Sequence, residues 1–366
     1  MQQNLTITYT KAVGIILMVL AHCSNFPLVD QIIHSFHMPL FFIVSGYCFK
    51  EKYLNEPLTF VQKRIVGLWW PYVKWGMLFL AMHNVFFRIN IYNDKWGYYG
   101  IVQHLYTFGD FVDKAKSILI MTKTESLLGG YWFLGSLFWG SLIAFGVLVC
   151  SHLLSKKVNC NLLVTSVLGG GGGGLVLVCL VTNYIPKTFT VFLIGPREFM
   201  AATFFIVGYF LAKSKMPKFN WWQSILAFGF LVANSFWGQI SAAAPFNDAL
   251  KVVPYMITAV FGTWCVYSLP WHRMKGTLAP FMEYVGNHTL EILTWHLLCF
   301  KIISYILILV HGLPIEQLAE IPVVGESART FKGWFVLYAI VGIGLPLLMT
   351  YLWENLKNKI VTFRHS

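Results

Sequence analysis

Long apolar runs, separated by short polar connections, recur along the whole chain. An α-helix needs about 20 apolar residues to cross the hydrocarbon core of a bilayer, and each run reaches roughly that length. The pattern therefore predicts an all-α, polytopic integral membrane helical bundle. We expect ten transmembrane helices, near residues 7–25, 32–49, 65–87, 131–154, 161–183, 190–212, 221–240, 252–270, 287–310 and 333–356.

The composition agrees with this pattern, because 57% of the 366 residues are hydrophobic and only 11% are charged. Such values are typical of polytopic membrane proteins. No stretch between the apolar runs is long enough to suggest a separate soluble domain, so we predict a single membrane domain over 1–366. The longest connection, 88–130, is rich in aromatic and acidic residues and is interpreted as a loop or cap over the substrate.

Basic residues dominate the charge, and the formal net charge is +12. They cluster in short connections, which indicates membrane orientation rather than nucleic-acid binding. The clusters that carry this signal are Lys50/Lys52/Lys63/Arg64, Lys156/Lys157, Lys213/Lys215/Lys218, Arg273/Lys275 and the tail with Lys357, Lys359 and Arg364. The positive-inside rule then predicts two cytoplasmic termini and an extracytoplasmic 88–130 connection. We expect the chain to be integral to the plasma membrane.

The seven cysteines occur singly, in or beside apolar runs. No CxxC pair or His/Cys ligand spacing accompanies them, so neither a zinc site nor a disulfide framework is indicated. We therefore expect no metal and no permanently bound cofactor.

Two ionisable side chains stand out in the first apolar run, "KAVGIILMVLAHC". Lys11 and His22 are eleven residues apart, which places them on one helix face about 16 Å apart. If Lys11 lies near the cytoplasmic surface, His22 lies near the middle of the membrane. A cation at the entrance and a titratable group at depth suit an anionic ligand. The alternatives are a lysine that snorkels to the surface and a structural histidine bonded to a neighbouring helix.

The second run, "HSFHMPLFFIVSGY", places His34 and His37 one turn apart. Its helix follows the first after a few residues, so we expect antiparallel neighbours with His37 at a depth near His22. Imidazole is the natural general base near neutral pH, and two imidazoles facing one cavity could handle protons together.

Five blocks together resemble the membrane acyltransferase-3 family: "KAVGIILMVLAHC", "SFHMPLFFIVSGY", "KRIVGLWWPY", "YWFLGSLF" and "GNHTLEILTWHL". They are most similar to its fucose 4-O-acetylase-like and exopolysaccharide O-acetyltransferase branch. The resemblance implies ten helices and transfer of an acyl group, commonly acetyl from cytoplasmic acetyl-CoA, to a hydroxyl of a glycan or lipid-linked sugar outside. The family's essential histidine corresponds to His22, and its cations correspond to Lys11 and Arg64.

Lysine stands at position 11, where that family often has arginine. A lysine keeps the charge attraction but lacks the bidentate fork that matches a phosphate. Coenzyme A carries several phosphate charges, and we expect Lys11, Lys63 and Arg64 to bind this donor. The sequence places Lys63 and Arg64 at the start of the third helix, where the helix dipole also favours anions. Their alternative role is as ordinary positive-inside markers.

Acyl transfer needs a base for the incoming hydroxyl or a nucleophile that carries the acyl group. No G-x-S-x-G motif is present, so His22 is predicted as base or transient acyl carrier, and the two roles stay open. Glu291, inside an apolar run, is a functional candidate by default. We expect it to orient an imidazole or neutralise Arg64, with a purely structural role as the alternative.

The acceptor side is expected to involve aromatic and polar residues near the outer ends of helices. Tyr131 and Trp132 could form a platform on which a sugar stacks, although aromatic belts occur at membrane interfaces anyway. Arg197 could line the same side or pair with Glu198. The predicted acceptor-binding set is Tyr131, Trp132, Arg197, Asn287 and His296.

Two functions of different classes fit these features. The first is a membrane O-acetyltransferase acting on an envelope glycan, with acyl-CoA, the glycan and the lipid bilayer as partners. The second is a transporter or flippase of a lipid-linked glycan. Transporters often contain repeated halves with interrupted helices, and no second copy of the Lys11/His22 pattern is seen, which favours the enzyme.

Overall fold

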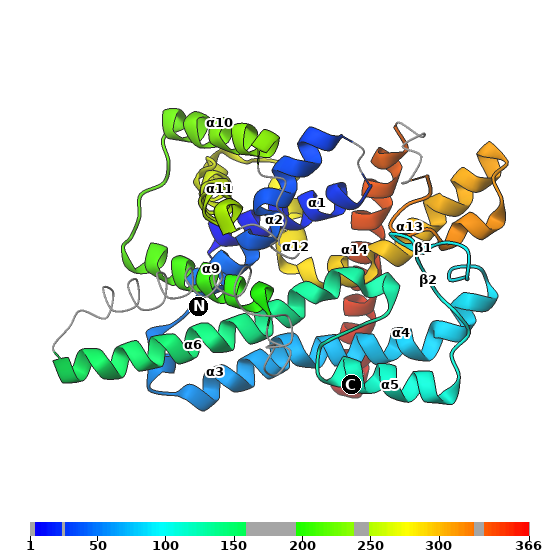
Figure 1. Cartoon of the computed structure of the whole chain (residues 1–366), viewed down its shortest axis with the longest axis horizontal. Coiled ribbons are helices and arrows are strands. Elements are labelled where there is room, and N and C mark those ends of the chain that lie inside the picture. The colour runs from blue at the N-terminus through cyan, green and yellow to red at the C-terminus, as the bar shows by residue number, and fades with distance from the viewer. Residues whose placement is uncertain (1–3, 24–25, 159–194, 238–248, 326–332, 366) are drawn as a thin grey trace. The chain divides into compact units, whose positions relative to one another are not determined.

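The computed structural model describes residues 4–23, 26–158, 195–237, 249–325 and 333–365, and they are mostly helical (Figure 1). This confirms the predicted all-α class. The longer helices are α1 (Leu5–Cys23), α2 (Pro27–Tyr47), α3 (Pro57–Arg64), α4 (Trp70–Arg88), α5 (Phe108–Leu119), α6 (Trp132–Val158), α9 (Pro196–Lys213), α10 (Trp221–Trp237), α11 (Ala249–Ser268), α12 (Leu278–Asn287), α13 (Thr289–His311) and α14 (Trp334–His365). Within these ranges, the only named strands are β1 (Gly97–Tyr98) and β2 (Ile101–Val102), which pair antiparallel.

Seven helices in the described ranges are long and apolar enough to cross a membrane. The segments are Leu5–Cys23, Pro27–Tyr47, Pro57–Arg88, Ser126–Leu154, Val252–Arg273, Thr289–His311 and Trp334–Lys359. The chain is therefore a multi-pass membrane protein. The predicted helix near 161–183 lies outside the described residues. The total of ten and the side on which the termini lie stay predictions.

Two predicted helices near 190–212 and 221–240 are present as the shorter helices α9 and α10. α9 has 18 residues and includes three charged side chains, and α10 has 17 residues. Both are shorter than the run of about 20 apolar residues that a typical span needs.

The chain forms two compact units, and each takes its residues from several stretches. Unit 1 contains Met1–Gly14, Phe26–Tyr72 and Trp132–Lys275, and unit 2 contains Ile15–Asn25, Val73–Tyr131 and Gly276–Ser366. Because the stretches alternate along the sequence, neither unit is a contiguous piece of chain. The prediction of one membrane domain over 1–366 stays a prediction.

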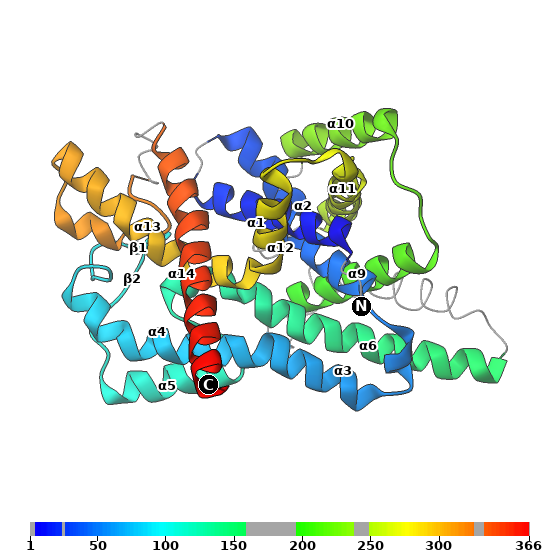
Figure 2. The same cartoon turned by 180° about the vertical axis from the view of Figure 1, so that it is seen from behind.

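In unit 1, glycines bring α2 and α9 into backbone contact. A Cβ added at Gly46 would collide with the carbonyl group of Phe205, and one at Gly208 would collide with the carbonyl group of Ile43. Small residues permit such close approach of helices in membranes. Helix α6 packs along α9 (Figure 2), and buried aromatic side chains fill the space around them.

In unit 2, α13 packs against α14. Phe300 on α13 fills the space beside Gly342, where an added Cβ would meet its ring. Helix α13 also contacts the turns η3 (Ser126–Tyr131) and η8 (Ile315–Ala319). The predicted connection 88–130 is thus folded, with the β1–β2 hairpin, α5 and most of η3 within it.

One predicted helix start is wrong. The helix expected from 65 begins at Pro57 and continues through a π-turn, η2 (Ile65–Trp69), into α4. Its first turns, "PLTFVQKR", are amphipathic, so the apolar run alone missed them, whereas a proline at the first helical position is a typical start. The helix expected from 287 is confirmed as α13, which begins at Thr289, and His288 separates it from the additional short helix α12.

Candidate functional site

A pair of histidines occupies unit 2, where α1 and α13 meet. Nδ1 of His22 lies 3.0 Å from Nε2 of His296, and the two ring planes differ by only 6°. The ring centroids are 5.1 Å apart, farther than the facing nitrogens, so the rings meet edge to edge. This is the geometry of an imidazole–imidazole hydrogen bond.

Backbone carbonyls determine which nitrogen of His296 carries the proton. Nδ1 of His296 lies 3.0 Å from the carbonyl oxygens of both Ile292 and Leu293, which only accept hydrogen bonds. Nδ1 must therefore donate, and in the neutral ring Nε2 is an acceptor. His22 then donates from Nδ1 to Nε2 of His296. In the neutral His22 ring this leaves the basic lone pair on Nε2.

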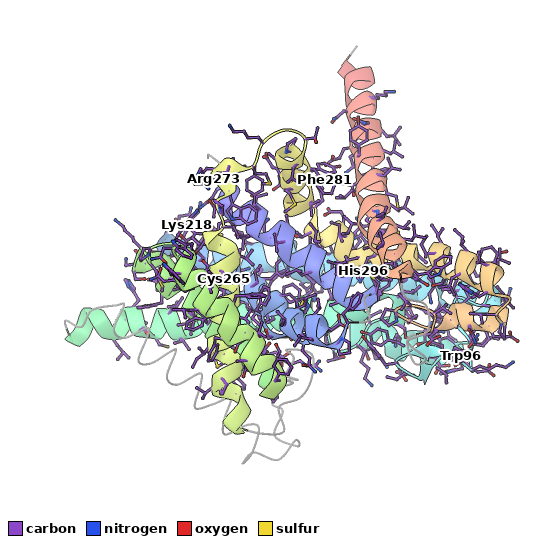
Figure 3. The ribbon with its side chains drawn as sticks, turned by 90° about the horizontal axis from the view of Figure 1, so that it is seen from above. Trp96, Lys218, Cys265, Arg273, Phe281 and His296 are labelled. Atoms are coloured by element: carbon purple, nitrogen blue, oxygen red, sulfur yellow. The ribbon has the colours of Figure 1, made fainter. Side chains whose placement is uncertain are left out.

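The two histidines differ in their surroundings. His296 is completely buried, whereas His22 is half-buried in the last turn of α1. Helix α1 ends at Cys23, close to the predicted end at 25. The expected depth of His22, near the middle of the membrane, stays a prediction. His296 lies in the second turn of α13 (Figure 3), deep in the apolar packing of unit 2.

The predicted donor-binding cations lie in unit 1. Lys11 and Arg64, from α1 and α3, both act electrostatically on the thiol of Cys48, as does Lys50. The guanidinium of Arg64 lies over the rings of Phe60 and Phe205, at 4.7 and 5.5 Å from their centroids. Three cations from separate parts of unit 1 thus act on one group, the Cys48 thiol. Such a concentration of positive charge suits an anionic ligand.

A family model described as an acyltransferase domain, Acyl_transf_3, matches residues 4–351. The chain belongs to the acyltransferase-3 family. Neither the curated proteins nor the solved structures compared with the chain gave a match. The acyltransferase assignment covers nearly the whole chain and therefore includes both units. The branch suggested by the sequence blocks stays a prediction.

In this acyltransferase, the structure gives His22 a partner that the sequence interpretation did not pair with it, His296. His37 belongs to unit 1, where its Nδ1 lies 2.7 Å from the carbonyl oxygen of Ile33. The ring of His34 packs against it edge-on, with centroids 5.2 Å apart. A catalytic role for His37 stays a prediction.

Lys63 and Arg64 occupy the last turn of α3, in the interior of a helical segment that begins at Pro57. The predicted attraction of anions by a helix N-terminus at these residues is therefore wrong, because that terminus lies two turns earlier. Lys63 donates to the hydroxyl of Tyr53 at 2.9 Å. Its charge remains exposed at the same end of unit 1 as Arg64.

Asn287 and Glu291 are four residues apart, but the break at His288 places them on different helices, α12 and α13. Asn287 is exposed at the end of α12. Glu291 is half-buried near the start of α13, and no hydrogen bond or ion pair of it is found among the described residues. Carbonyls orient the imidazole of His296, so the orienting role predicted for Glu291 is not needed there.

The predicted acceptor residues fall into two groups. Tyr131 is completely buried, and its hydroxyl lies 2.7 Å from that of Thr294. A buried ring cannot stack on a sugar, so this role is wrong in the described conformation. Trp132 and Arg197 do come together in unit 1, with the guanidinium 5.4 Å from the indole centroid. Glu198 instead accepts hydrogen bonds from Ser136 and from the Gly195 N–H.

The sequence interpretation missed a second buried histidine in unit 2. Nδ1 of His83 lies 2.6 Å from a carboxylate oxygen of Glu125, and Nε2 lies 2.9 Å from the carbonyl oxygen of His104. Both side chains are completely buried, and the ring of Tyr106 stacks on His83. Through these contacts, His83 on α4 binds two residues of the 88–130 segment, Glu125 and His104. Its signal was a histidine within an apolar helix, the same signal that identified His22.

Proposed function

We propose that the protein is a membrane O-acetyltransferase of the plasma membrane. It takes an acetyl group from cytoplasmic acetyl-CoA and delivers it to a hydroxyl of an envelope glycan or lipid-linked sugar. The observation that carries this proposal is the hydrogen bond between His22 and His296 in a chain of the acyltransferase-3 family. No cofactor takes part; acetyl-CoA is the donor substrate.

The protonation pattern of the pair supports His22 as the group that acts on the substrate. With its Nδ1 donating to His296, the Nε2 lone pair takes the proton of the acceptor hydroxyl as that oxygen attacks the thioester carbonyl. The C–S bond then breaks, and the CoA sulfur leaves as a thiolate that takes up the proton from His22. His296 acts through His22 as a positioning residue, because it fixes the tautomer and the ring plane.

A variant of this mechanism uses the same lone pair as a nucleophile. Nε2 of His22 then attacks the thioester carbonyl, the C–S bond breaks and CoA leaves as a thiolate. The acetyl group rests on the imidazole until the acceptor hydroxyl attacks it, the N–C bond breaks, and the hydroxyl proton passes to the thiolate. The cations Lys11, Lys63 and Arg64 serve both routes by attracting the phosphates of the donor.

The test is an incubation of membranes carrying wild-type protein or His22→Ala with acetyl-CoA labelled in the acetyl group. Label is followed into glycan and into the protein. We expect label in the glycan only with wild-type protein, and His22-dependent label on the protein would identify the acyl carrier. Folding of the variant is checked by its elution and thermal midpoint in detergent.

A transporter or flippase of lipid-linked glycan predicts a different result. Well-folded wild-type protein would then transfer no label to its native glycan, while glycan would still cross the membrane. That outcome would overturn the proposed acetyltransferase.

A further inference from the structure

A cavity of about 450 Å³ lies in unit 2 beside the β1–β2 hairpin. Its lining includes two aromatic rings, one lysine, one carboxylate and two glycines: Trp96, Tyr99, Lys95, Glu320, Gly97 and Gly100. Its volume falls in the range of small-molecule sites, which combine apolar walls with a few polar groups. The residues that the acyltransferase mechanism uses are not among them.

Two chain segments far apart in sequence build this cavity. Ile321 joins the edge of the hairpin, since its N–H donates to the Gly97 carbonyl at 3.2 Å and its carbonyl accepts from the Tyr99 N–H at 3.3 Å. Asn93 donates to the carbonyl of Glu316 at 2.8 Å. The predicted topology places 88–130 and the α13–α14 connection on the same side of the membrane, the outer one. Their hydrogen bonds agree with the same side, and the outer side stays a prediction.

The wall chemistry favours a carbohydrate. Trp96 is half-buried and Tyr99 is 58% exposed, and both rings line the cavity. Glu320 is 7% exposed, and the Gly325 N–H, 2.9 Å from Oε2, orients its carboxylate. Aromatic faces suit the C–H faces of a sugar ring, and a carboxylate accepts charge-assisted hydrogen bonds from its hydroxyls.

Other ligand classes fit less well. The cavity has one lysine, Lys95, whose ammonium already lies 3.4 Å from a carboxylate oxygen of Glu316. Lys95 is thus already paired, and the Glu320 carboxylate in the same wall disfavours a phosphate or nucleotide. A purely apolar lipid chain would make no use of either charged group.

The cavity is attached to the helix that carries His296. The buried ammonium of Lys301, also on α13, donates at 2.7 Å to the carbonyls of both Leu318 and Glu320. Lys301 follows His296 by five residues, a rise of about 7.5 Å along the helix. Figure 3 shows Trp96 and His296 well apart, so the cavity is distinct from the reacting centre.

We infer that this cavity is a subsite for the acceptor glycan, which holds a sugar unit remote from the hydroxyl that is acetylated. The inference rests on the proposed function, because it identifies the acceptor as a chain of more than one sugar. Contacts to such a remote unit are the same in the ground state and the transition state, so they lower the KM for the glycan without changing kcat.

The test uses full-length protein in lipid nanodiscs and oligosaccharide fragments of the de-O-acetylated envelope glycan of the producing cells. Wild type is compared with Trp96→Ala and Glu320→Gln, and Trp222→Ala serves as the control because Trp222 is an exposed indole of unit 1. Fragment binding is followed by saturation-transfer NMR, and acetyl transfer by steady-state kinetics. Thermal midpoints confirm that the variants are folded.

We expect Trp96→Ala to raise the KM for the glycan about tenfold and to weaken saturation transfer, while kcat and the KM for acetyl-CoA stay near wild type. Glu320→Gln, which keeps the side-chain volume, should show a smaller change in the same direction. An unchanged glycan KM with unchanged saturation transfer in a folded Trp96→Ala protein would overturn the subsite.

The two proposals fail in different ways. If fragments bind through Trp96 but wild-type protein transfers no acetyl group, the acetyltransferase proposal fails and the cavity stands as a glycan site. If transfer depends on His22 but not on Trp96, the acetyltransferase stands and the subsite is wrong.

Discussion

Nδ1 of His22 faces Nε2 of His296 at 3.0 Å, although 274 residues separate them in sequence. The carbonyls of Ile292 and Leu293 hold the far side of the second ring. One direction of proton donation therefore runs from His22 through His296 to the backbone of α13. This direction of donation leaves Nε2 of His22 as the basic nitrogen. The group that accepts from Nδ1 of His22 is an imidazole, where other catalytic histidines often use a carboxylate.

This direction predicts different effects for two substitutions of His296. His296→Phe removes the acceptor for the His22 Nδ1–H and should lower kcat by about 10²-fold or more, with little change in the KM for acetyl-CoA. His296→Gln keeps an oxygen that can accept the same hydrogen bond and should retain more activity. Labelled acetyl transfer measures both variants, and equal activity of the two would contradict a positioning role.

Charge at position 11 should control donor binding. We expect Lys11→Ala to raise the KM for acetyl-CoA about tenfold, because one cation near Cys48 is lost, whereas Lys11→Arg keeps it. Steady-state kinetics with varied acetyl-CoA tests this. If both variants behave alike, the charge at this site does not matter for the donor.

The contact of α2 with α9 predicts a strong dependence on residue size. Gly46→Ala places a methyl group against the backbone of Phe205 and should reduce stability by about 1–3 kcal/mol or more. Gly229→Ala on α10 is the matched control, because no described atom lies within 4 Å of its added Cβ. Thermal midpoints in detergent compare the two, and equal midpoints would show that the helices can separate without cost.

Lys301 should be important for stability rather than chemistry. Lys301→Met leaves the carbonyls of Leu318 and Glu320 without their donor, at about 1–3 kcal/mol for each buried group. The control is Lys357→Met, since Lys357 is exposed on α14. The thermal midpoint should fall only for Lys301→Met. An unchanged midpoint would mean that water or another group replaces the ammonium.

Unit 1 contains a surface ion pair with a defined pH dependence. The hydrogen bond from Lys213 lowers the pKa of Glu51 below its usual value of 4.5, and Tyr209 donates to the same oxygen. The pair therefore stabilises the folded state above about pH 4.5, and this contribution is lost as the pH falls through the lowered pKa.

Glu51→Gln should remove that dependence. Because the Glu51 side chain is 45% exposed, we expect a loss of at most about 1 kcal/mol at pH 7 and no further loss in acid. Thermal midpoints of wild type and variant between about pH 3 and pH 7 test this. Curves that stay parallel over the whole range would contradict the assignment.

Hydropathy along the chain was sufficient to predict the helical class and most of the helices that the structure describes. His22 could be identified from its local sequence. Placing an imidazole in an apolar membrane helix is unfavourable in free energy, so such a residue is a candidate for function. The partner of His22 could not be identified in this way, since the pairing of α1 with α13 depends on tertiary packing. Counting residues along one helix gives no information about a contact 274 residues away.

The failed predictions have the same origin. Tyr131 was expected at a sugar-binding surface because aromatic residues gather at membrane interfaces, but Thr294 provides a buried partner for its hydroxyl. The helix start predicted at 287 did agree with the break at His288, which directly follows Gly286 and Asn287, two residue types that favour helix ends. Glu125 stands in a polar connection, and only the fold brings it to His83.

If the cavity holds the acceptor as proposed, the pairing of Ile321 with the hairpin at Gly97 and Tyr99 limits how acceptor preference can be exchanged between relatives. A chimera that receives only the 88–130 segment of a relative obtains one wall of that relative's cavity. The backbone hydrogen bonds between the new hairpin and the original Ile321 segment would then no longer match. To change acceptor specificity, the hairpin and the α13–α14 connection would have to be exchanged together. The two segments are expected to diverge in concert rather than one at a time.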